Sequence, residues 1–260
     1  MEIAEKKSTD IHKGERVMLT KETIASWFKP GKKLAVITGA GISTESGIPD
    51  FRSSGGLFSQ EVKRNIPLET VLSVDFFESY PKGFFEFYRE KLMIKGAQPN
   101  EGHRFLKHLE DRGMAVTIIT QNIDGLHQLA GSQNVLELHG NAHRFITKSG
   151  VTVYADDLDY VDGLFMANGE DVRPDITLYG EQLDGDVLQK SMQAVREADI
   201  LLVLGTSLIV YPAAGLIYDY QGDKSILVTR GITPLDSYFN GVFDEAISEW
   251  TRDIIHLFHN

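Results

Sequence analysis

The sequence predicts an α/β protein built on a doubly wound, Rossmann-like parallel sheet, with two smaller inserted modules. Short apolar and β-branched runs alternate along the chain with segments of helical periodicity, as a parallel sheet requires. A glycine-rich turn, Gly39-Ala40-Gly41, directly follows the first of these runs. Polar motifs begin where four of the runs end, and ligands bind at the carboxyl ends of strands in such sheets. These observations together predict one composite site.

The composition indicates a soluble globular protein and excludes several other classes. The chain has 260 residues, of which 42% are hydrophobic and 24% charged, which suits one large domain with a smaller insert. The net charge of -11 argues against binding nucleic acid. With no cysteine, disulfides, thiolate nucleophiles and thiolate metal sites are excluded. No run could span a bilayer and the N-terminus has no signal-peptide pattern, so we expect a cytoplasmic protein without a membrane partner.

The N-terminal quarter of the chain contains the first predicted strand of the parallel sheet and the glycine turn that follows it. Residues 1–17 are expected to form a flexible arm, and residues 19–28 a short helix closed by Pro30 and Gly31. Residues 34–38 read as a buried parallel strand, and the glycine turn after them can bring backbone amides close to a pyrophosphate. Thr44 stands where a dinucleotide fingerprint has its third glycine, and Pro49 predicts that the following helix ends early.

The middle of the chain predicts a helical insert over residues 57–96. Aromatic side chains recur there at helical spacing, as at Phe84 and Tyr88, which is typical of a packed core, although a minority of the rings could line a substrate tunnel. Asn100 is expected to cap the next helix, with His103 as a packing residue. A further helix is expected over residues 187–197. Five more strands are predicted, over residues 115–120, 135–138, 176–178, 200–204 and 225–229.

These elements divide the chain into a main domain and two inserts. The Rossmann-like domain takes residues 18–56, 97–141 and 176–260, and the helical insert separates its first two parts. Residues 142–175 are rich in Asp and Gly, have a modest strand signal at residues 151–154, and are expected to form a second, small module.

Two motifs carry groups that are capable of catalysis. Residues 120–127 read TQNIDGLH, and amide and carboxylate side chains at a strand end can hold a ribose and a carboxamide. The same residue types also form turns and helix caps, so the residues alone leave both interpretations open. His139 closes another strand in ELHG, and an imidazole titrates near neutrality, as a general base must. A single histidine at a strand end is also commonly structural.

In combination these motifs resemble the sirtuins, the NAD-dependent protein deacylases. The resemblance rests on GAGISTESGIPDFRS at residues 39–53, TQNIDGLH and ELHG, and it extends over about residues 19–250. It implies NAD as the cofactor and an acylated lysine in a protein or peptide as the partner. The implied products are deacylated lysine, nicotinamide and O-acyl-ADP-ribose.

The resemblance also implies the site residues. His139 would be the catalytic base and Asn122 would position the reacting end of NAD. The residues implied to bind NAD are Gly39, Ala40, Thr44, Asp50, Phe51, Arg52, Gln121, Asn122, Ile123, Asp124, His139, Gly205, Thr206, Ser207 and Thr229. The residues implied to bind the peptide, partly by main-chain pairing, are Ile176, Tyr179, Gly180, Glu181 and Val210. His127 and His143 are weaker candidates for the base, because only His139 matches the HG motif of the family.

The sequence departs from the family pattern in two places. Members usually carry two CxxC pairs that hold structural zinc, but the corresponding residues 146–149 and 166–169 contain no thiol, so we expect no metal. Thr229 stands where the family usually has an asparagine that contacts the adenosine ribose. A small apolar core in place of the metal is expected from Phe145, Tyr154, Leu158, Tyr160, Leu164 and Phe165.

Three functions stay open on this reading. The leading hypothesis is an NAD-dependent protein-lysine deacylase. A protein ADP-ribosyltransferase on the same scaffold would share the NAD site, and a non-catalytic ADP-ribose-binding module would bind without turnover. The absence of a Tyr-x-x-Arg pair from the helical insert favours acetyl or another neutral acyl group. A hydride-transferring dehydrogenase is disfavoured, because the glycine fingerprint is incomplete.

Overall fold

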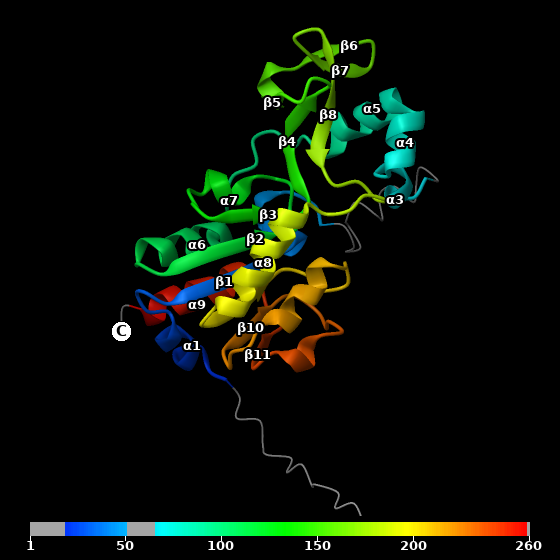
Figure 1. Cartoon of the computed structure of the whole chain (residues 1–260). Helices are drawn as coiled ribbons and strands as arrows, with labels where there is room; N and C mark the ends of the chain where they lie inside the picture. Colours follow the sequence, from blue (N-terminus) through cyan, green and yellow to red (C-terminus); the bar gives the residue numbers. More distant parts are fainter. Residues whose placement is uncertain (1–18, 51–65, 259–260) are drawn as a thin grey trace, which may run out of the picture.

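The structure, a computed structural model, describes residues 19–50 and 66–258. Figure 1 shows a parallel sheet with its helices in the lower part and a smaller antiparallel sheet above it, with α3, α4 and α5 at its side. The arm predicted over residues 1–17 lies outside the described residues, as do Phe51 and Arg52.

The parallel sheet has the strand order β11-β10-β9-β1-β2-β3, and every pairing in it is parallel. From β1 the chain moves to β2 and β3 on one side, and it later crosses to β9, β10 and β11 on the other. The order therefore reverses between β1 and β9, and the predicted doubly wound sheet is confirmed. The strands are β1 (Lys33–Thr38), β2 (Ala115–Thr120), β3 (Val135–Glu137), β9 (Ile200–Leu204), β10 (Ser225–Val228) and β11 (Gly241–Phe243).

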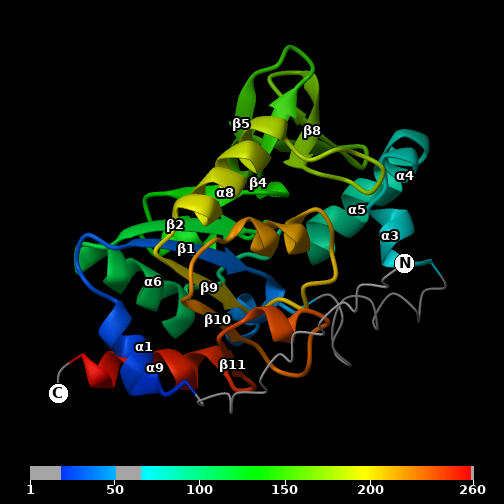
Figure 2. The same ribbon diagram turned by 60° about the horizontal axis from the view of Figure 1, so that its bottom comes forward.

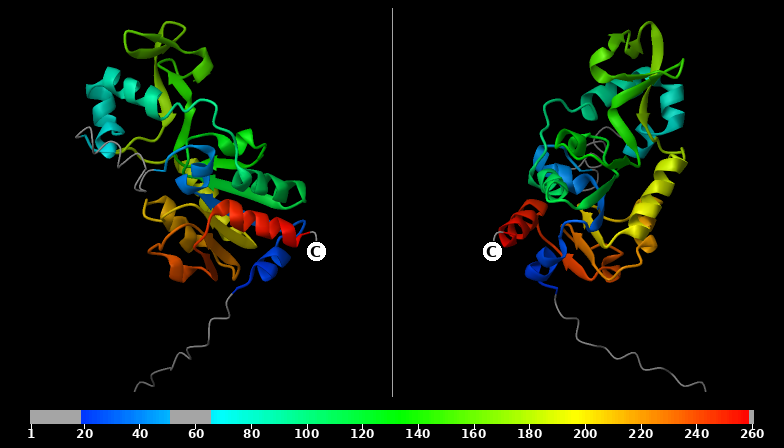
Figure 3. Two further views of the ribbon diagram at one scale, coloured as in Figure 1. Left: turned by 180° about the vertical axis from the view of Figure 1, so that it is seen from behind. Right: turned by 60° about the vertical axis from the view of Figure 1, so that its left-hand side comes forward.

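Helices cover both faces of this sheet. Leu34 and Val36 point to one face and share a core with α1 (Lys21–Trp27), α6 (Glu101–Asp111) and α9 (Ile247–Leu257). Ala35 and Ile37 point to the opposite face, which α8 (Gly185–Glu197) and the 3₁₀ helix η4 (Ala213–Asp219) cover. Leu235 and Phe239, on either side of the 3₁₀ helix η5 (Asp236–Tyr238), pack on the same face. Figure 2 shows the two layers of helices with the sheet between them, and Figure 3 shows α9 beside α1. Burial on both faces explains why the central strands read as unbroken apolar runs.

The two predicted inserts pack into one small domain. Its helices are α3 (Leu68–Val71), α4 (Val74–Ser79) and α5 (Pro81–Lys91). Its antiparallel sheet has the order β5-β4-β8-β7-β6. The strands are β4 (Gly140–Thr147), β5 (Thr152–Tyr154), β6 (Asp159–Val161), β7 (Leu164–Ala167) and β8 (Glu170–Ile176), with the 3₁₀ turn η3 (Ala155–Asp157) between β5 and β6.

Aromatic rings join the helices of the small domain to its sheet. Phe85 of α5 meets Phe165 of β7 edge to face at 5.3 Å, and Tyr88 meets Phe145 of β4 at 5.7 Å. Such pairs add about 0.5–1.5 kcal/mol each beyond the area that they bury. The predicted aromatic core is confirmed for Phe84, Phe85 and Tyr88, because all three are buried.

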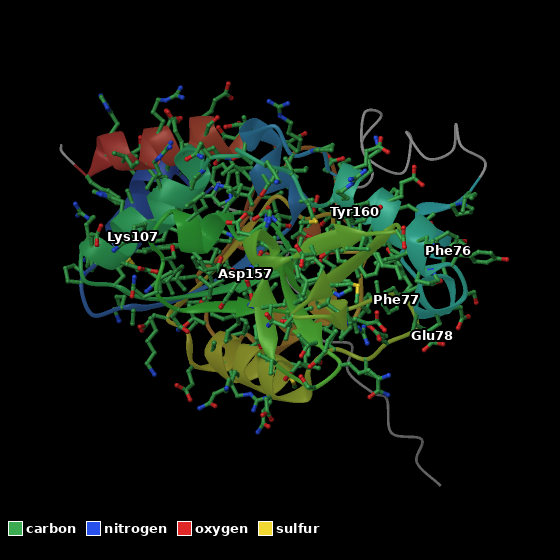
Figure 4. The ribbon with its side chains drawn as sticks, turned by 90° about the horizontal axis from the view of Figure 1, so that it is seen from above. Phe76, Phe77, Glu78, Lys107, Asp157 and Tyr160 are labelled. Atoms are coloured by element: carbon green, nitrogen blue, oxygen red, sulfur yellow. The ribbon has the colours of Figure 1, made fainter. Side chains whose placement is uncertain are left out.

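Helix α4 of the small domain and helix α6 of the main domain lie at opposite ends of the molecule. In the view from above, Phe76, Phe77 and Glu78 of α4 lie at one end and Lys107 of α6 lies at the other (Figure 4).

Several expectations from the sequence were wrong. The predicted parallel strand at residues 176–178 does not exist: Ile176 ends β8, which pairs antiparallel with β4. A three-residue apolar run carries no information about strand direction, so only the tertiary contacts decide it. The parallel strand β11 was missed because it has only three residues, and most strands of the small domain were missed too, of which β6 and β7 are also short. Tyr154 (59% exposed) lies outside the expected small core, and Tyr160 (36% exposed) lies at its edge, with its ring 5.0 Å from that of Phe165. Phe145 and Phe165 are buried in this core.

The two segments expected to correspond to the metal-binding pairs of the family, residues 146–149 and 166–169, flank the start of β8. The N–H of Lys148 donates to the carbonyl oxygen of Asp171 (3.1 Å), and Met166 pairs with Asp171 from the other side. The Oγ1 of Thr147 accepts from the N–H of Val151 (3.0 Å), and the N–H of Ser149 donates to Glu170 (3.0 Å). Hydroxyl and single carboxylate groups in these turns do not fit zinc, which takes four Cys or His ligands in structural sites.

The rest of the described chain offers no alternative metal site. Among residues 19–50 and 66–258, no group of three or more His, Asp or Glu side chains is arranged to hold an ion. Within the same ranges, no helix combines the length and apolar character that crossing a membrane requires.

Prolonged chelation should leave the melting temperature unchanged. The core around Phe145 and Phe165 is expected to hold the small domain without ligand bonds, because residues 146–149 and 166–169 contain no Cys or His. A structural zinc would contribute on the order of 10 kcal/mol to folding, so its removal would be obvious. Differential scanning calorimetry with and without chelator checks this, together with elemental analysis. Stoichiometric zinc, or a melting temperature that falls on chelation, would contradict it.

Gly140→Ala should strongly destabilise the fold. Gly140 has φ +80°, and an added Cβ would overlap the carbonyl oxygen of Asp175 on the neighbouring strand β8. The left-handed conformation alone costs a non-glycine residue about 1–2 kcal/mol, and we expect a total loss above about 3 kcal/mol. The matched control is Gly150→Ala, because Gly150 has φ +85° but no atom within 4 Å of the added Cβ. Urea unfolding of both variants measures the difference, and equal losses would contradict the steric account.

Candidate active site

Two turns meet in backbone contact at the carboxyl edge of the parallel sheet. The N–H of Gly39 donates to the carbonyl oxygen of Leu204 (3.1 Å), and the N–H of Gly41 donates to that of Gly205 (2.8 Å). A Cβ on Gly39 would lie 2.7 Å from Cβ of Thr206, and one on Gly41 would lie 2.8 Å from Cα of Gly205. The sequence suggested that these glycines let the backbone approach a ligand. In the structure, they let the loop after β1 approach the loop after β9.

The helix after the glycine turn is short, as predicted. It is the 3₁₀ helix η1 (Ala40–Ser46), and it ends at Gly47, which has φ +81°. Asn100 holds η1 in place, because its Nδ2 donates to the carbonyl oxygen of Ile42 (2.7 Å) and to Oγ of Ser46 (2.9 Å). The same side chain caps α6 by accepting from the N–H of Gly102, so the predicted cap is confirmed. One residue thus ties the glycine loop to a helix of the main domain.

A cavity of about 1190 Å³ runs along this edge of the sheet. Among the residues that the structure describes, it gathers all but one of those implied to bind NAD, and all of those implied to bind peptide. They are Gly39, Ala40, Thr44, Asp50, Gln121, Asn122, Ile123, His139, Gly205, Thr206, Ser207 and Thr229, with Ile176, Tyr179, Gly180, Glu181 and Val210. The cavity also takes in Arg230 and Glu245 near Thr229, which the sequence reading missed because no motif marks them.

Asp124 lines a second cavity, of about 700 Å³, that lies next to the first. Ala40, Asn122 and Ile123 line both cavities and so form the wall between them. The carboxylate of Asp124 accepts from Oγ of Ser43 (2.6 Å) and from the N–H of Leu126 (2.9 Å). The motif that begins at Thr120 therefore presents polar side chains to both cavities: Gln121 and Asn122 to the first, and Asn122 and Asp124 to the second.

Asn122 is held by hydrogen bonds on its side chain and on its backbone. Its Nδ2 donates to the carbonyl oxygen of Gly39 (3.1 Å) and to Oγ of Ser43 (3.1 Å). Its backbone N–H donates to Oγ1 of Thr120 (3.0 Å). Sequence reasoning missed Ser43 and Thr120 as parts of this arrangement. The only available signal was that both lie within the two motifs.

His139 faces the first cavity in its neutral form. Its Nδ1 lies 2.9 Å from the carbonyl oxygen of Gln121. Because a carbonyl only accepts, Nδ1 carries the proton and Nε2 keeps its lone pair. Burial lowers the pKa of His139, and the hydrogen bond to Gln121 opposes this shift only in part. The side chain of Gln121 bridges to the other loop by donating to Oγ1 of Thr206 (3.2 Å).

The other two histidine candidates lie away from this cavity. His127 is 1% exposed and its Nε2 lies 3.0 Å from Oγ1 of Thr38, so it cannot reach a ligand in the first cavity. His143 lines the second cavity. His139 is therefore the histidine, among the three considered, that combines access to the first cavity with an unprotonated nitrogen.

The segment expected to pair with a peptide is partly engaged already. The N–H of Tyr179 donates to the carbonyl oxygen of Leu72 (2.9 Å), and the N–H of Val74 donates to that of Tyr179 (3.1 Å). The carboxylate of Glu181 accepts two bonds from Arg173 (2.6 Å each) and one from the N–H of Leu178 (2.8 Å). Glu181 therefore braces the loop after β8, and a peptide strand would have to pair beside Tyr179 rather than with it.

The fold and the position of the cavity define a doubly wound nucleotide-binding class of protein, with the cleft at the point where strand order reverses. Comparison with known sequences gives the family. The family model described as Sir2 family matches residues 39–212, and this chain belongs to that family.

Two curated relatives and one solved structure illustrate the similarity. The NAD-dependent protein deacetylase of Clostridium acetobutylicum is 44% identical over 230 residues, covering 84% of this chain and 90% of the relative. The protein of the same name from Staphylococcus aureus (strain MSSA476) is 41% identical over 218 residues, covering 83% and 89%. A solved structure described as Sir2-p53 peptide-NAD+ aligns with a TM-score of 0.79 at 32% identity, covering 93% of this chain and 99% of that one.

Proposed function

We propose that this chain is an NAD-dependent protein-lysine deacetylase. The observation that carries the proposal is the first cavity, which joins a glycine loop, an uncharged histidine and the segment around Tyr179 in one space. A nucleotide and a peptide could therefore meet at His139. The names of the relatives in Clostridium and Staphylococcus, both NAD-dependent protein deacetylases, support this reading.

The described residues fit NAD in size and in chemistry. The volume of about 1190 Å³ exceeds the range of about 300–1,000 Å³ that is usual for small-molecule pockets, which leaves room for a dinucleotide and one peptide side chain. The backbone amide of Ala40, with the hydroxyls of Thr206 and Ser207, would hold the pyrophosphate beside Gly39. Thr229 would lie at the adenosine end, and Gln121 at the nicotinamide ribose.

The proposed reaction needs one proton acceptor and a fixed nicotinamide end. NAD supplies the ADP-ribosyl group that receives the acyl group when nicotinamide departs. Nε2 of His139 would take the proton from a ribose hydroxyl, because its Nδ1 proton is already committed to Gln121. Asn122 and Asp124, which Ser43 bridges, would orient the carboxamide. The apolar side chains of Ile123 and Ile176 would help to exclude water from the reacting atoms.

Turnover of an acyl-lysine peptide panel tests the proposal. Each peptide is incubated with NAD, and the masses of all products are recorded. A deacetylase gives free lysine, nicotinamide and an ADP-ribose that carries the acyl mass. An ADP-ribosyltransferase instead adds the ADP-ribosyl mass to a protein, and a binding module releases no nicotinamide. Either of these outcomes would overturn the proposal, and the matched control is the same peptide without its acyl group.

His139→Ala should lower kcat by at least on the order of 10²-fold, the lower end of what general bases contribute. NAD binding should change little, since the imidazole acts on a transition state rather than on bound NAD. In the unaltered protein, kcat/KM should stay constant above pH 6.5, the ordinary pKa of histidine, because burial lowers the pKa of His139. It should fall only when acidification protonates Nε2. Near-normal turnover in the variant would exclude His139 as the base.

Asp124→Asn should weaken NAD binding more than ADP-ribose binding. The substitution keeps an oxygen for the N–H of Leu126 but removes the charged acceptor for Ser43, at the end of the site proposed for nicotinamide. We expect about a tenfold loss for NAD, which corresponds to one hydrogen bond, and less than about twofold for ADP-ribose. Isothermal titration calorimetry with both ligands decides it. Equal weakening of the two would count against the assignment.

A further inference from the structure

Two buried histidines in the main domain take no part in the proposed chemistry. His103 of α6 is 0% exposed and His127 of α7 (Leu126–Leu129) is 1% exposed, and their ring centroids lie 4.8 Å apart. Burial lowers the pKa of His103 to about 4 and that of His127 to about 3, so both rings are neutral near pH 7. Each ring then has one donor and one acceptor nitrogen.

An unbroken chain of hydrogen bonds leads from His127 to Asn122. Nε2 of His127 lies 3.0 Å from Oγ1 of Thr38. The hydroxyl of Thr38 donates to Oγ1 of Thr120 (2.9 Å), which also accepts from the backbone N–H of Asn122 (3.0 Å). Thr38 and Thr120 are register partners at the ends of β1 and β2, and all four side chains are less than 10% exposed.

The direction of these bonds fixes the proton on His127. Because the hydroxyl of Thr38 gives its proton to Thr120, its oxygen accepts from His127, whose Nε2 must carry the proton. Nδ1 of His127 is then an acceptor without a hydrogen-bond partner. In His103, Nδ1 lies within hydrogen-bond distance of two groups of Asn100, its backbone N–H (3.3 Å) and its Oδ1 (3.1 Å), and Nε2 has no partner. The two unpaired nitrogens, Nδ1 of His127 and Nε2 of His103, belong to adjacent rings.

The same pair of rings also supports the glycine loop. His103 and Asn100 form the reciprocal cap of α6, and Asn100 holds η1 through Ile42 and Ser46. Each ring is therefore hydrogen-bonded to a different part of the site. His103 connects to η1 through Asn100, and His127 connects to Asn122 through Thr38 and Thr120. Replacing a buried hydrogen-bonded pair by apolar groups of the same shape is often nearly neutral for stability, so stability alone gives little reason for polar groups here.

We propose that His127, backed by His103, is a positioning residue that fixes the backbone of Asn122 through the hydroxyls of Thr38 and Thr120. The consequence for catalysis rests on the proposed function, because Asn122 orients the nicotinamide end only if NAD is the ligand. The positioning itself does not depend on that function. Without the acceptor at Thr120, the peptide between Gln121 and Asn122 keeps only the bond from Nδ1 of His139 to its carbonyl oxygen. The side chain of Asn122 is then held only by Gly39 and Ser43.

Two substitutions at one position isolate the hydroxyl. Thr120→Val keeps the shape of the side chain but removes the acceptor, whereas Thr120→Ser keeps the acceptor and removes a methyl group. The matched control is Thr251→Val, because Thr251 of α9 is buried like Thr120 (0% and 3% exposed) and its hydroxyl bonds within its own helix, to the carbonyl oxygen of Ser248 (3.2 Å). At His127, Gln retains a donor near the place of Nε2 and Leu does not.

Hydrogen exchange of the Asn122 amide tests the positioning independently of any activity. Thr120→Val should speed this exchange by about tenfold, the equivalent of one lost hydrogen bond, while Thr120→Ser and Thr251→Val should leave it unchanged. His127→Leu should speed the exchange more than His127→Gln. Unchanged exchange in Thr120→Val, or equal effects of Gln and Leu, would overturn the proposal. A Thr120→Val protein that does not fold, beside a folded Thr251→Val, would also overturn it, since the hydroxyl would then be needed for stability.

Kinetics with NAD and an acetyl-lysine peptide test the consequence for catalysis. Thr120→Val should lower kcat by about tenfold and leave the Kd for ADP-ribose within about twofold, because only the nicotinamide end depends on Asn122. Thr120→Ser should restore kcat. A normal kcat in Thr120→Val would contradict the effect on catalysis. If the unaltered protein shows no turnover, the proposed function fails, and the exchange result still decides whether Asn122 is positioned in this way.

Discussion

Backbone contact between the loops after β1 and β9 is the constraint on which the site depends. Gly39, Gly41 and Gly205 approach so closely that a Cβ on any of them would overlap the opposite loop. Because β1 and β9 flank the point where strand order reverses, their ends would otherwise diverge with the helices that follow them. The contact instead keeps both loops at one edge, where the residues after β2 and β10 line the same cavity.

The polar groups of the site are held from within the main domain, and the small domain adds the remaining wall. Asn100 fixes η1, and the buried path from His127 fixes Asn122, so the glycine loop and the motif after β2 rest on the same pair of rings. The small domain contributes Ile176 at the end of β8, with Tyr179 just beyond it. Its core joins aromatic rings such as Phe85, Tyr88, Phe145 and Phe165 to aliphatic side chains of its helices and strands.

The sequence predicted the doubly wound sheet and most of its strands, because strands buried on both faces leave long apolar runs. It also predicted which motifs would meet, since the ends of parallel strands lie at one edge. The prediction failed where an element was only a few residues long, or where contacts between distant parts of the chain decided its structure. Ile176 lies in an antiparallel strand, β11 has three residues, and Tyr154 and Tyr160 are exposed. The path through Thr38, Thr120 and His127 was missed, because only strand register brings those hydroxyls together.

The central claim is that the carboxyl edge between β1 and β9 holds a dinucleotide with its reacting end at His139. A crystal structure of the complex with ADP-ribose tests it most directly. The account predicts the pyrophosphate against Gly39–Ala40 and Thr206–Ser207, the adenosine near Thr229, and the terminal ribose within hydrogen-bond distance of Gln121 or His139. ADP-ribose bound outside this cavity, or reversed so that its adenosine lies at His139, would contradict the account.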